Sequence, residues 1–322
     1  MSQTTGIDIQ SHFLPASYAE AATREAAEDS RWASSHGVLT VPPTAPIRRL
    51  DGRVQDMLGA GIRLAIVSVP AAIFRVQARA IDASRESNSD LVELASADRD
   101  HFRVLASLPM PFVAASLKEL ERISGQPLVA GIIMPAGAAD WSLDDGQFQP
   151  IYAAASAAGL PIMLHPSLEP AALAFQRWAL AASVAVPVET SMAALRLMLS
   201  GVLDDHPDLS IIVPHLGGVL PYLTQRLLDQ TGRGDAKYDV GYYLRHRVFY
   251  DNCSFHQPAL MCAVETVGAD RIMLGSDYPF RGQLSRCVSD VLDSVLSQDQ
   301  QKSIISGTAE SVMRNLADGT GS

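Results

Sequence analysis

Residues 129–166 read VAGIIMPAGAADWSLDDGQFQPIYAAASAAGLPIMLHP, and this stretch indicates how the chain folds. Its two ends, 129–136 and 160–166, are short, continuous apolar runs, which are typical of strands buried on both faces of a parallel sheet. Residues 148–158 have helical spacing, and Gly159 stops the helix directly before the second run. The stretch therefore predicts one strand–helix–strand unit.

The same alternation occurs along the whole chain. Further apolar runs lie at 6–12, 63–70, 102–109, 209–216, 248–254 and 271–279. Segments with helical spacing lie between several of them, at 48–61, 78–98, 113–124 and 190–204. About eight such units in a row predict a (β/α)₈ TIM barrel. A doubly wound open sheet is the alternative, but it usually has fewer strands and a glycine-rich first turn, which this sequence lacks.

Two stretches interrupt the alternation, residues 16–46 after the first predicted strand and residues 167–188 after the fifth. Both follow the carboxyl ends of strands, the face on which barrel active sites lie, so both are candidate lids or substrate walls. Packing on the barrel or contact between subunits explains them equally well. No linker interrupts the pattern, and we expect one domain over residues 1–322.

Composition narrows the class of function. The formal net charge of -10 argues against a nucleic-acid-binding protein, which usually has a basic face. The N-terminal MSQTTGIDIQ does not resemble a signal peptide, and Pro, Gly or charged residues break the apolar runs before they could span a bilayer. The three cysteines lack CxxC spacing, which suits a reducing compartment. We expect a cytoplasmic enzyme for a small molecule, assembled as a homodimer or larger homo-oligomer.

Four polar side chains, His12, His165, His215 and Asp277, stand at the carboxyl ends of predicted strands one, five, six and eight. A barrel would bring these strand ends together around one axis. Imidazole and carboxylate ligands suit a divalent ion such as Zn²⁺, with Mn²⁺ as the alternative, and a catalytic ion needs about three protein ligands and an open position. A single histidine is more often a structural residue, so it is the joint placement that predicts a metal centre.

The sequences around these residues resemble a known family. IDIQSHFLP (7–15) is similar to the opening IDxHxHxxP motif of the amidohydrolase superfamily, and LPIMLHP (160–166) is similar to its fifth strand. PHLGG (214–218) and GSDYPF (275–280) resemble its HxGG and GTDYPF motifs. Together they resemble the branch that contains aminocarboxymuconate semialdehyde decarboxylase and the resorcylate-type decarboxylases, from residue 7 to about residue 316.

This resemblance implies that His12, His165 and Asp277 bind one divalent metal and that His215 is a catalytic acid or base. Strand four contains no Lys, which favours a single ion over a binuclear centre. Gln10 replaces the first histidine of the HxH pair. Its carbonyl oxygen could complete the site; alternatively the ion is held by three ligands only, or metal has been lost and the pocket works by acid–base chemistry alone.

Other residues are candidates for binding the substrate. Arg53, in DGRVQDMLGAGI (51–62), stands in a segment that resembles RxxxMDxxGV of the decarboxylases, and this implies contact with a substrate carboxylate. A solvated helix arginine is the alternative. His256 and Phe280 are candidate pocket residues, although ordinary surface or rim positions explain them too. Asp8 is expected to support the ligands of the first strand.

Two reactions fit a metal beside a proton shuttle. Non-oxidative decarboxylation of a small aromatic or unsaturated carboxylic acid needs an acid that protonates the carbon carrying the CO₂ group, and His215 or Asp277 could supply this proton. Hydrolysis or hydration of a ring, lactone or amide is the alternative and uses nearly the same groups. The family branch favours the decarboxylase. A barrel that only binds a ligand is the third possibility, motivated by Gln10.

Overall fold

The computed structural model describes residues 5–167 and 177–316, and its centre is a sheet of eight parallel strands in the order β1 to β8. The strands are β1 (Gly6–His12), β2 (Ile62–Ser68), β3 (Phe102–Ser107), β4 (Val129–Pro135), β5 (Ile162–His165), β6 (Ile211–Val213), β7 (Val248–Asp251) and β8 (Ile272–Met273). Strands that neighbour one another in sequence also pair in space, which confirms the predicted TIM barrel and excludes the doubly wound order.

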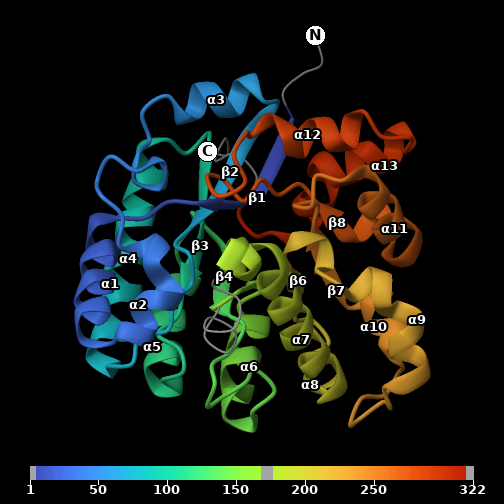
Figure 1. Cartoon of the computed structure of the whole chain (residues 1–322), viewed down its shortest axis with the longest axis horizontal. Helices are drawn as coiled ribbons and strands as arrows, with labels where there is room; N and C mark the ends of the chain where they lie inside the picture. Colours follow the sequence, from blue (N-terminus) through green and yellow to red (C-terminus); the bar gives the residue numbers. More distant parts are fainter. Residues whose placement is uncertain (1–4, 168–176, 317–322) are drawn as a thin grey trace.

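Helices surround the strands on all sides of the view (Figure 1). They are α1 (Ala16–Glu28), α2 (Ser30–His36), α3 (Arg53–Gly59), α4 (Gln77–Ala97), α5 (Val113–Ser124), α6 (Gln149–Ala157), α7 (Val186–Leu199), α8 (Val202–Asp205), α9 (Leu220–Gln230), α10 (Val240–His246), α11 (Gln257–Val267), α12 (Ser285–Leu292), α13 (Gln298–Lys302) and α14 (Thr308–Val312).

The barrel closes where β1 meets the segment after β8. The Ile9 amide donates to the Leu274 carbonyl at 2.9 Å, and Ser11 pairs in parallel with Tyr278. β6 and β8 are shorter than the apolar runs predicted. His215 and Asp277, further along the chain, adopt positive φ angles of 57° and 52°, which no strand accommodates. Both residues therefore stand on tight turns at strand ends.

One apolar cluster fills the inside of the barrel and a second lies between strands and helices. Ala309, Met313 and Leu316, near the C-terminus, belong to the inner cluster. The backbone amide of Arg314 donates to the Ala130 carbonyl at 3.1 Å, at the beginning of β4. The C-terminal segment thus covers the end of the barrel where strands begin, and the opposite end is left for the site.

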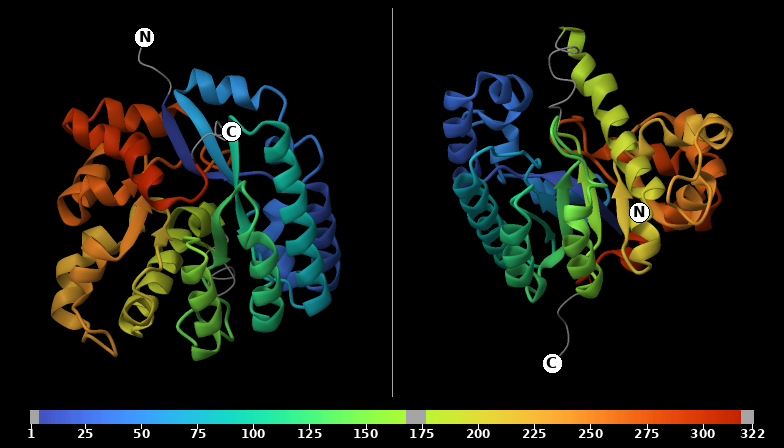
Figure 2. Two further views of the ribbon diagram at one scale, coloured as in Figure 1. Left: turned by 180° about the vertical axis from the view of Figure 1, so that it is seen from behind. Right: turned by 90° about the horizontal axis from the view of Figure 1, so that it is seen from below.

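Both predicted insertions follow strands at that opposite end. The first contains α1, α2 and the 3₁₀ turn η1 (Gly37–Leu39), to the left in Figure 1. Of the second, residues 168–176 lie outside the described residues, and η4 (Arg177–Ala179) and η5 (Ala181–Ala185) lead into α7. This yellow-green helical segment extends beyond the rest of the molecule in Figure 2, right.

Contrary to the prediction that the apolar runs are too short to span a bilayer, the segment Arg177–Leu199 is apolar and long enough to cross a membrane, by length and composition alone. Only 33% of its most apolar stretch is buried. The exposed side chains Val184, Val188 and Met192 recur every four residues, so they share one face of the helix.

Candidate active site

The site is assembled first by backbone hydrogen bonds between β1 and the turn after β8. The Asp277 amide donates to the Gln10 carbonyl at 2.8 Å, and the His12 amide donates to the Tyr278 carbonyl at 2.8 Å. These two bonds hold the side chains of β1 beside the Asp277 carboxylate. The Nε2 atom of His12 lies 3.3 Å from Oδ1 of Asp277.

The His12 imidazole is completely buried, and only one of its two nitrogens has a hydrogen-bond partner. Its Nδ1 lies 3.1 Å from Oγ of Ser68, at the end of β2. Its Nε2 has no hydrogen-bond partner among the described residues, although it faces the Asp277 carboxylate. A buried nitrogen in this position costs free energy unless a donor or a cation occupies the space in front of it.

The His165 imidazole, at the end of β5, is ready to act as a ligand. Its Nδ1 lies 2.8 Å from the Pro166 carbonyl, which only accepts hydrogen bonds, so Nδ1 carries the proton. Burial and the neighbouring histidines hold the pKa of His165 well below its usual value, so the ring is neutral and Nε2 keeps its lone pair. The ring meets that of His12 edge-on, with centroids 5.3 Å apart.

Gln10 lies between the catalytic candidates of β6 and β8. Its Nε2 is 3.5 Å from both Oδ1 of Asp277 and Nε2 of His215, and its buried Oε1 has no hydrogen-bond partner among the described residues. Two long contacts and an unpaired oxygen are weak restraints on a buried amide. The side chain is therefore available to present its oxygen to a ligand.

His215 stands on the turn η6 (His215–Gly217) that follows β6. Its Nε2 is 3.9 Å from Oδ2 of Asp277, and its Nδ1 is buried without a hydrogen-bond partner in the described part of the chain. Burial lowers the pKa of His215, while the Asp277 carboxylate raises it. A proton can pass between these two groups after a small movement of either side chain.

Two glycines give the His215 turn its shape. A Cβ on Gly217 would lie 2.8 Å from the Tyr250 ring, and a Cβ on Gly218 would lie 2.2 Å from the Pro187 carbonyl oxygen. Their φ angles of 75° and 61° also favour glycine. The HLGG motif is thus required by close packing at the carboxyl end of β6.

Two buried carboxylates that do not line the cavity hold the turns that carry the site. Oδ1 of Asp8 accepts from the Ser276 amide at 2.9 Å and from the Gln10 amide at 3.2 Å, and its Oδ2 accepts from Oγ of Ser276. Oδ1 of Asp251 accepts from the amides of Leu216 and Cys253 at 3.0 and 2.8 Å. Burial raises the pKa of Asp8 to about 6 and that of Asp251 to about 7.

Asp8 thus has the supporting position that the sequence predicts. Asp251 was not among the candidates, although it lies within the run 248–254 that was predicted to be a strand. An acidic residue at a strand end was the available signal.

Three of these side chains, His165, His215 and Asp277, line a cavity of about 630 Å³, a size typical of small-molecule sites, whereas His12 and Gln10 are not among its described lining residues. Its floor includes His165, His215 and Asp277. Its wall comes from both insertions and from the segment after β8, and includes His36, Leu39, Ser167, Ser183, Phe280 and Arg281. The expectation that the insertions form substrate walls agrees with this lining.

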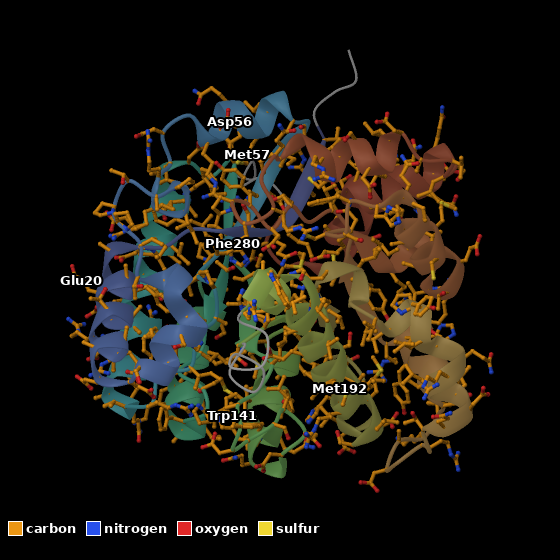
Figure 3. All side chains as sticks on the ribbon, in the orientation of Figure 1. Glu20, Asp56, Met57, Trp141, Met192 and Phe280 are labelled. Atoms are coloured by element: carbon orange, nitrogen blue, oxygen red, sulfur yellow. The ribbon has the colours of Figure 1, made fainter. Side chains whose placement is uncertain are left out.

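The three predicted substrate-binding residues lie in different places. Phe280 lines the cavity with its ring centroid 5.4 Å from that of His12, and it is near the centre of Figure 3. His256 is exposed and is not among the described residues that line the cavity. Arg53 is also outside this lining: it is buried, and its Nη2 donates to Oγ of Ser11 and to the His12 carbonyl at 2.7 and 2.9 Å. Arg53 therefore holds the end of β1 by hydrogen bonds and does not line the cavity.

The donor atoms at the cavity floor fit a divalent cation by their chemistry. Across the described ranges, no three His, Cys, Asp or Glu side chains stand together as a complete metal-binding group. However, Oε1 of Gln10, the Asp277 carboxylate and the Nε2 lone pair of His165 are acceptors, and the unpaired Nε2 of His12 is one in the tautomer that donates from Nδ1 to Ser68. A cation is the partner that such a set lacks, and Gln10 takes the place of a fourth ionisable ligand.

Comparison with known proteins agrees with this geometry. The family model for "Amidohydrolase" matches residues 7–314. The chain is 28% identical to "Gamma-resorcylate decarboxylase" of a Polaromonas species, over 82% of this chain and 87% of that protein. It is 30% identical to "Decarboxylase orsB" of Emericella nidulans, over 71% and 74% of the two chains.

A solved structure is also similar along nearly its whole length. It is a dihydroxybenzoic acid decarboxylase from Polaromonas with bound manganese and the inhibitor 2-nitroresorcinol, with a TM-score of 0.81, 26% identity and 97% coverage of each chain. The resemblance noted in the sequence motifs is thereby confirmed.

Proposed function

This chain belongs to the amidohydrolase family, and from this premise we propose that it is a metal-dependent, non-oxidative decarboxylase of a small aromatic or unsaturated carboxylic acid. The observation that carries the proposal is the group of potential ligand atoms on His12, Gln10, His165 and Asp277, of which His165 and Asp277 line the 630 Å³ cavity. The relatives named above are decarboxylases, and this favours decarboxylation over hydrolysis.

The metal ligands in this proposal are Nε2 of His12, Nε2 of His165 and the Asp277 carboxylate, completed by Oε1 of Gln10. A divalent cation held there supplies positive charge that attracts the carboxylate of the substrate and polarises it. Carboxylate and amide oxygens suit Mn²⁺, whereas the two imidazoles suit Zn²⁺ equally well. Manganese in the similar solved structure favours Mn²⁺ over the Zn²⁺ expected from the sequence.

The proton chemistry is assigned to His215 and Asp277. The enzyme first gives a proton to the carbon that carries the carboxylate. The bond between that carbon and the carboxylate carbon then breaks, its electron pair restores the unsaturated system, and CO₂ leaves. The enzyme regains a proton from solvent. His215 and Asp277 lie 3.9 Å apart at the floor, so either can hold this proton and pass it to the other.

The wall suits a planar, anionic substrate. Phe280 offers an aromatic surface beside His12, and Arg281 is the one Lys or Arg side chain among the described residues that line the cavity. A guanidinium at the wall attracts an organic acid into a protein with a net charge of -10. In this proposal Arg281 rather than Arg53 meets the anion, because Arg53 is bonded to the backbone behind β1.

We also propose that the chain forms a homo-oligomer through the helical segment of η5 and α7. The exposed apolar face of Val184, Val188 and Met192 supports this, because a face of this kind is usually covered in solution. A cytoplasmic location is supported by the free thiols of Cys253, Cys262 and Cys287.

The test is CO₂ release from a panel of hydroxybenzoic acids by the purified protein, with Mn²⁺ or Zn²⁺ and with chelator. We expect metal-dependent release from at least one acid and loss of that release with chelator. Release that is equal with and without chelator contradicts the metal dependence. Hydrolysis of lactone or amide analogues with no CO₂ from any acid contradicts the decarboxylase proposal.

A further inference from the structure

The turn that carries His215 has an unusual backbone. Its consecutive residues His215, Leu216, Gly217 and Gly218 have positive φ angles of 57°, 56°, 75° and 61°. The first two are not glycine, and a left-handed conformation at such a residue costs free energy that the surrounding structure has to offset. The position of the His215 imidazole therefore depends on contacts that hold this turn from outside.

Two neighbouring elements hold the turn. On one side, Oδ1 of Asp251, at the end of β7, accepts from the Leu216 amide at 3.0 Å. On the other side, Oγ of Ser191 in α7 accepts from the amide of Val219, the residue after Gly218, at 3.0 Å. The Ser191 side chain is buried, with 1% of the residue exposed. Ser191 thus joins the turn to a helix that precedes it in the chain.

The beginning of α7 approaches the turn closely at this point. A Cβ on Gly218 would lie 2.2 Å from the Pro187 carbonyl oxygen and 2.4 Å from Oγ of Ser191. The Ser191 hydroxyl lies 2.6 Å from the Pro187 carbonyl and 3.2 Å from the Gly217 carbonyl, and it donates to one or the other. Pro187 and Gly218 both line the cavity. The junction therefore lies at the edge of the site, directly after His215.

A neighbouring hydroxyl shows that this contact is not a general property of the helix. Thr190 is also buried, and its Oγ1 donates to the carbonyls of Val186 and Pro187 at 3.2 and 3.4 Å, both within α7. Hydroxyls in helices commonly bond to a carbonyl one turn earlier, and Ser191 does so as well. What distinguishes Ser191 is that its oxygen also accepts from Val219, outside the helix.

We propose that Ser191 is a positioning residue, which holds the turn after β6 and thereby keeps the His215 imidazole within reach of Asp277 and the substrate. This rests on the proposed decarboxylase function, in which His215 is an acid or base. Removal of the hydroxyl leaves the Val219 amide without this acceptor and releases one end of a strained turn. A displacement of about 1 Å can lower the rate of an enzyme by about 100-fold.

The experiment compares Ser191→Ala with Thr190→Val, which removes a buried hydroxyl of the same helix and keeps the shape of the side chain. Both are loaded with Mn²⁺, and kcat and KM are measured for the hydroxybenzoic acid from which the wild type releases CO₂ fastest. We expect kcat of Ser191→Ala to fall about tenfold, with KM and metal content within about twofold of the wild type. Thr190→Val should keep the kcat of the wild type.

A spectroscopic measurement follows His215 itself and does not require activity. In ¹H–¹³C spectra of the Zn²⁺-loaded protein with labelled histidine, the ring signal of His215 is assigned by its absence in His215→Asn. This signal should move in Ser191→Ala and stay in place in Thr190→Val. The signal of His101, directly before β3, should stay in place in both variants.

A milder variant serves as a second step. Ser191→Cys has a side chain of the same length, but its sulfur accepts hydrogen bonds only weakly. Its kcat should lie between those of the wild type and Ser191→Ala. If Ser191→Ala does not fold, Ser191→Cys takes its place in the comparison with Thr190→Val.

Failure of this inference and failure of the proposed function give different results. Absence of CO₂ release from any acid by the wild type refutes the decarboxylation, whereas a His215 signal that moves only in the Ser191 variants still supports the positioning role. An unchanged kcat and an unchanged His215 signal in folded Ser191→Ala overturn that role, and a lower melting temperature then means that the hydroxyl only stabilises α7. Equal losses of kcat in Ser191→Ala and Thr190→Val overturn it as well.

Discussion

The floor and the wall of the cavity are built in different ways. The floor stands on barrel strands, and backbone bonds between β1 and the turn after β8 set the positions of Gln10 and Asp277. Much of the wall comes from the two insertions, where His36 and Ser183 belong to the short helical segments α2 and η5. From this difference we propose that the barrel fixes the chemistry, whereas the insertions select the molecule on which it acts.

The largest expected effect concerns the floor. His215→Asn should lower turnover by a factor of roughly 100 or more, the size typical of removing a general acid or base. Metal content should stay nearly unchanged, because the ligands lie on other strands. Steady-state rates and metal analysis on the same preparation check both statements. If activity survives and the metal is lost, His215 is a ligand and Asp277 is the proton donor.

The support beneath the floor should show in stability. Asp8→Ala leaves the amides of Ser276 and Gln10 buried and unpaired, so we expect a loss of about 3 kcal/mol in the free energy of unfolding. Asp8→Asn keeps an acceptor oxygen and should lose less. Urea unfolding of the metal-free protein gives both values, with Ser183→Ala on the wall as control. A loss below about 0.5 kcal/mol in Asp8→Ala contradicts the supporting role.

A smaller expected effect concerns the wall: the free energy of unfolding should depend on pH through His36. The pKa of His36 is about 4 in the folded protein and about 6.5 in the unfolded chain. As pH falls below 6.5, the unfolded chain takes up a proton that the folded protein refuses, so stability is lost in the window from 6.5 down to 4. Between pH 7 and pH 5 the wild type should lose about 2 kcal/mol more than His36→Phe.

Thermal unfolding of both proteins at the two pH values measures this difference. If stability falls equally in the two proteins between pH 7 and pH 5, His36 is solvated in the folded protein, and the account of a fixed, neutral ring in the wall is wrong.

The floor could be predicted from the sequence because strand ends in a barrel converge. His12, His165, His215 and Asp277 stand in separate motifs, and only the closed order of the strands brings them together. The positions of β1 and α5 also agree with the prediction to the residue, since apolar runs and helical spacing are local signals.

The rest depends on contacts that no local pattern encodes. Arg53 was assigned to the substrate from its motif, but its contacts with Ser11 and the His12 backbone arise from how α3 packs behind β1. His36 attracted no attention in the sequence, because its buried position depends on the stacking of one ring on Trp32 inside an insertion. The register shift of β1 between Asp8 and Ser11 also could not be predicted, because the sequence analysis assumed that side chains alternate strictly between the two faces of the strand.

The central claim is that one divalent ion is held at the floor by His12, His165 and Asp277. Metal analysis of the purified protein beside His165→Ala tests it most directly, with circular dichroism to show that the fold is retained. Gln10→Ala serves as the matched control for the weaker fourth position, and Gln10→His should bind at least as tightly as the wild type. We predict about one ion per chain in the wild type, much of it kept in Gln10→Ala and nearly none in folded His165→Ala. Full occupancy in His165→Ala would contradict the account.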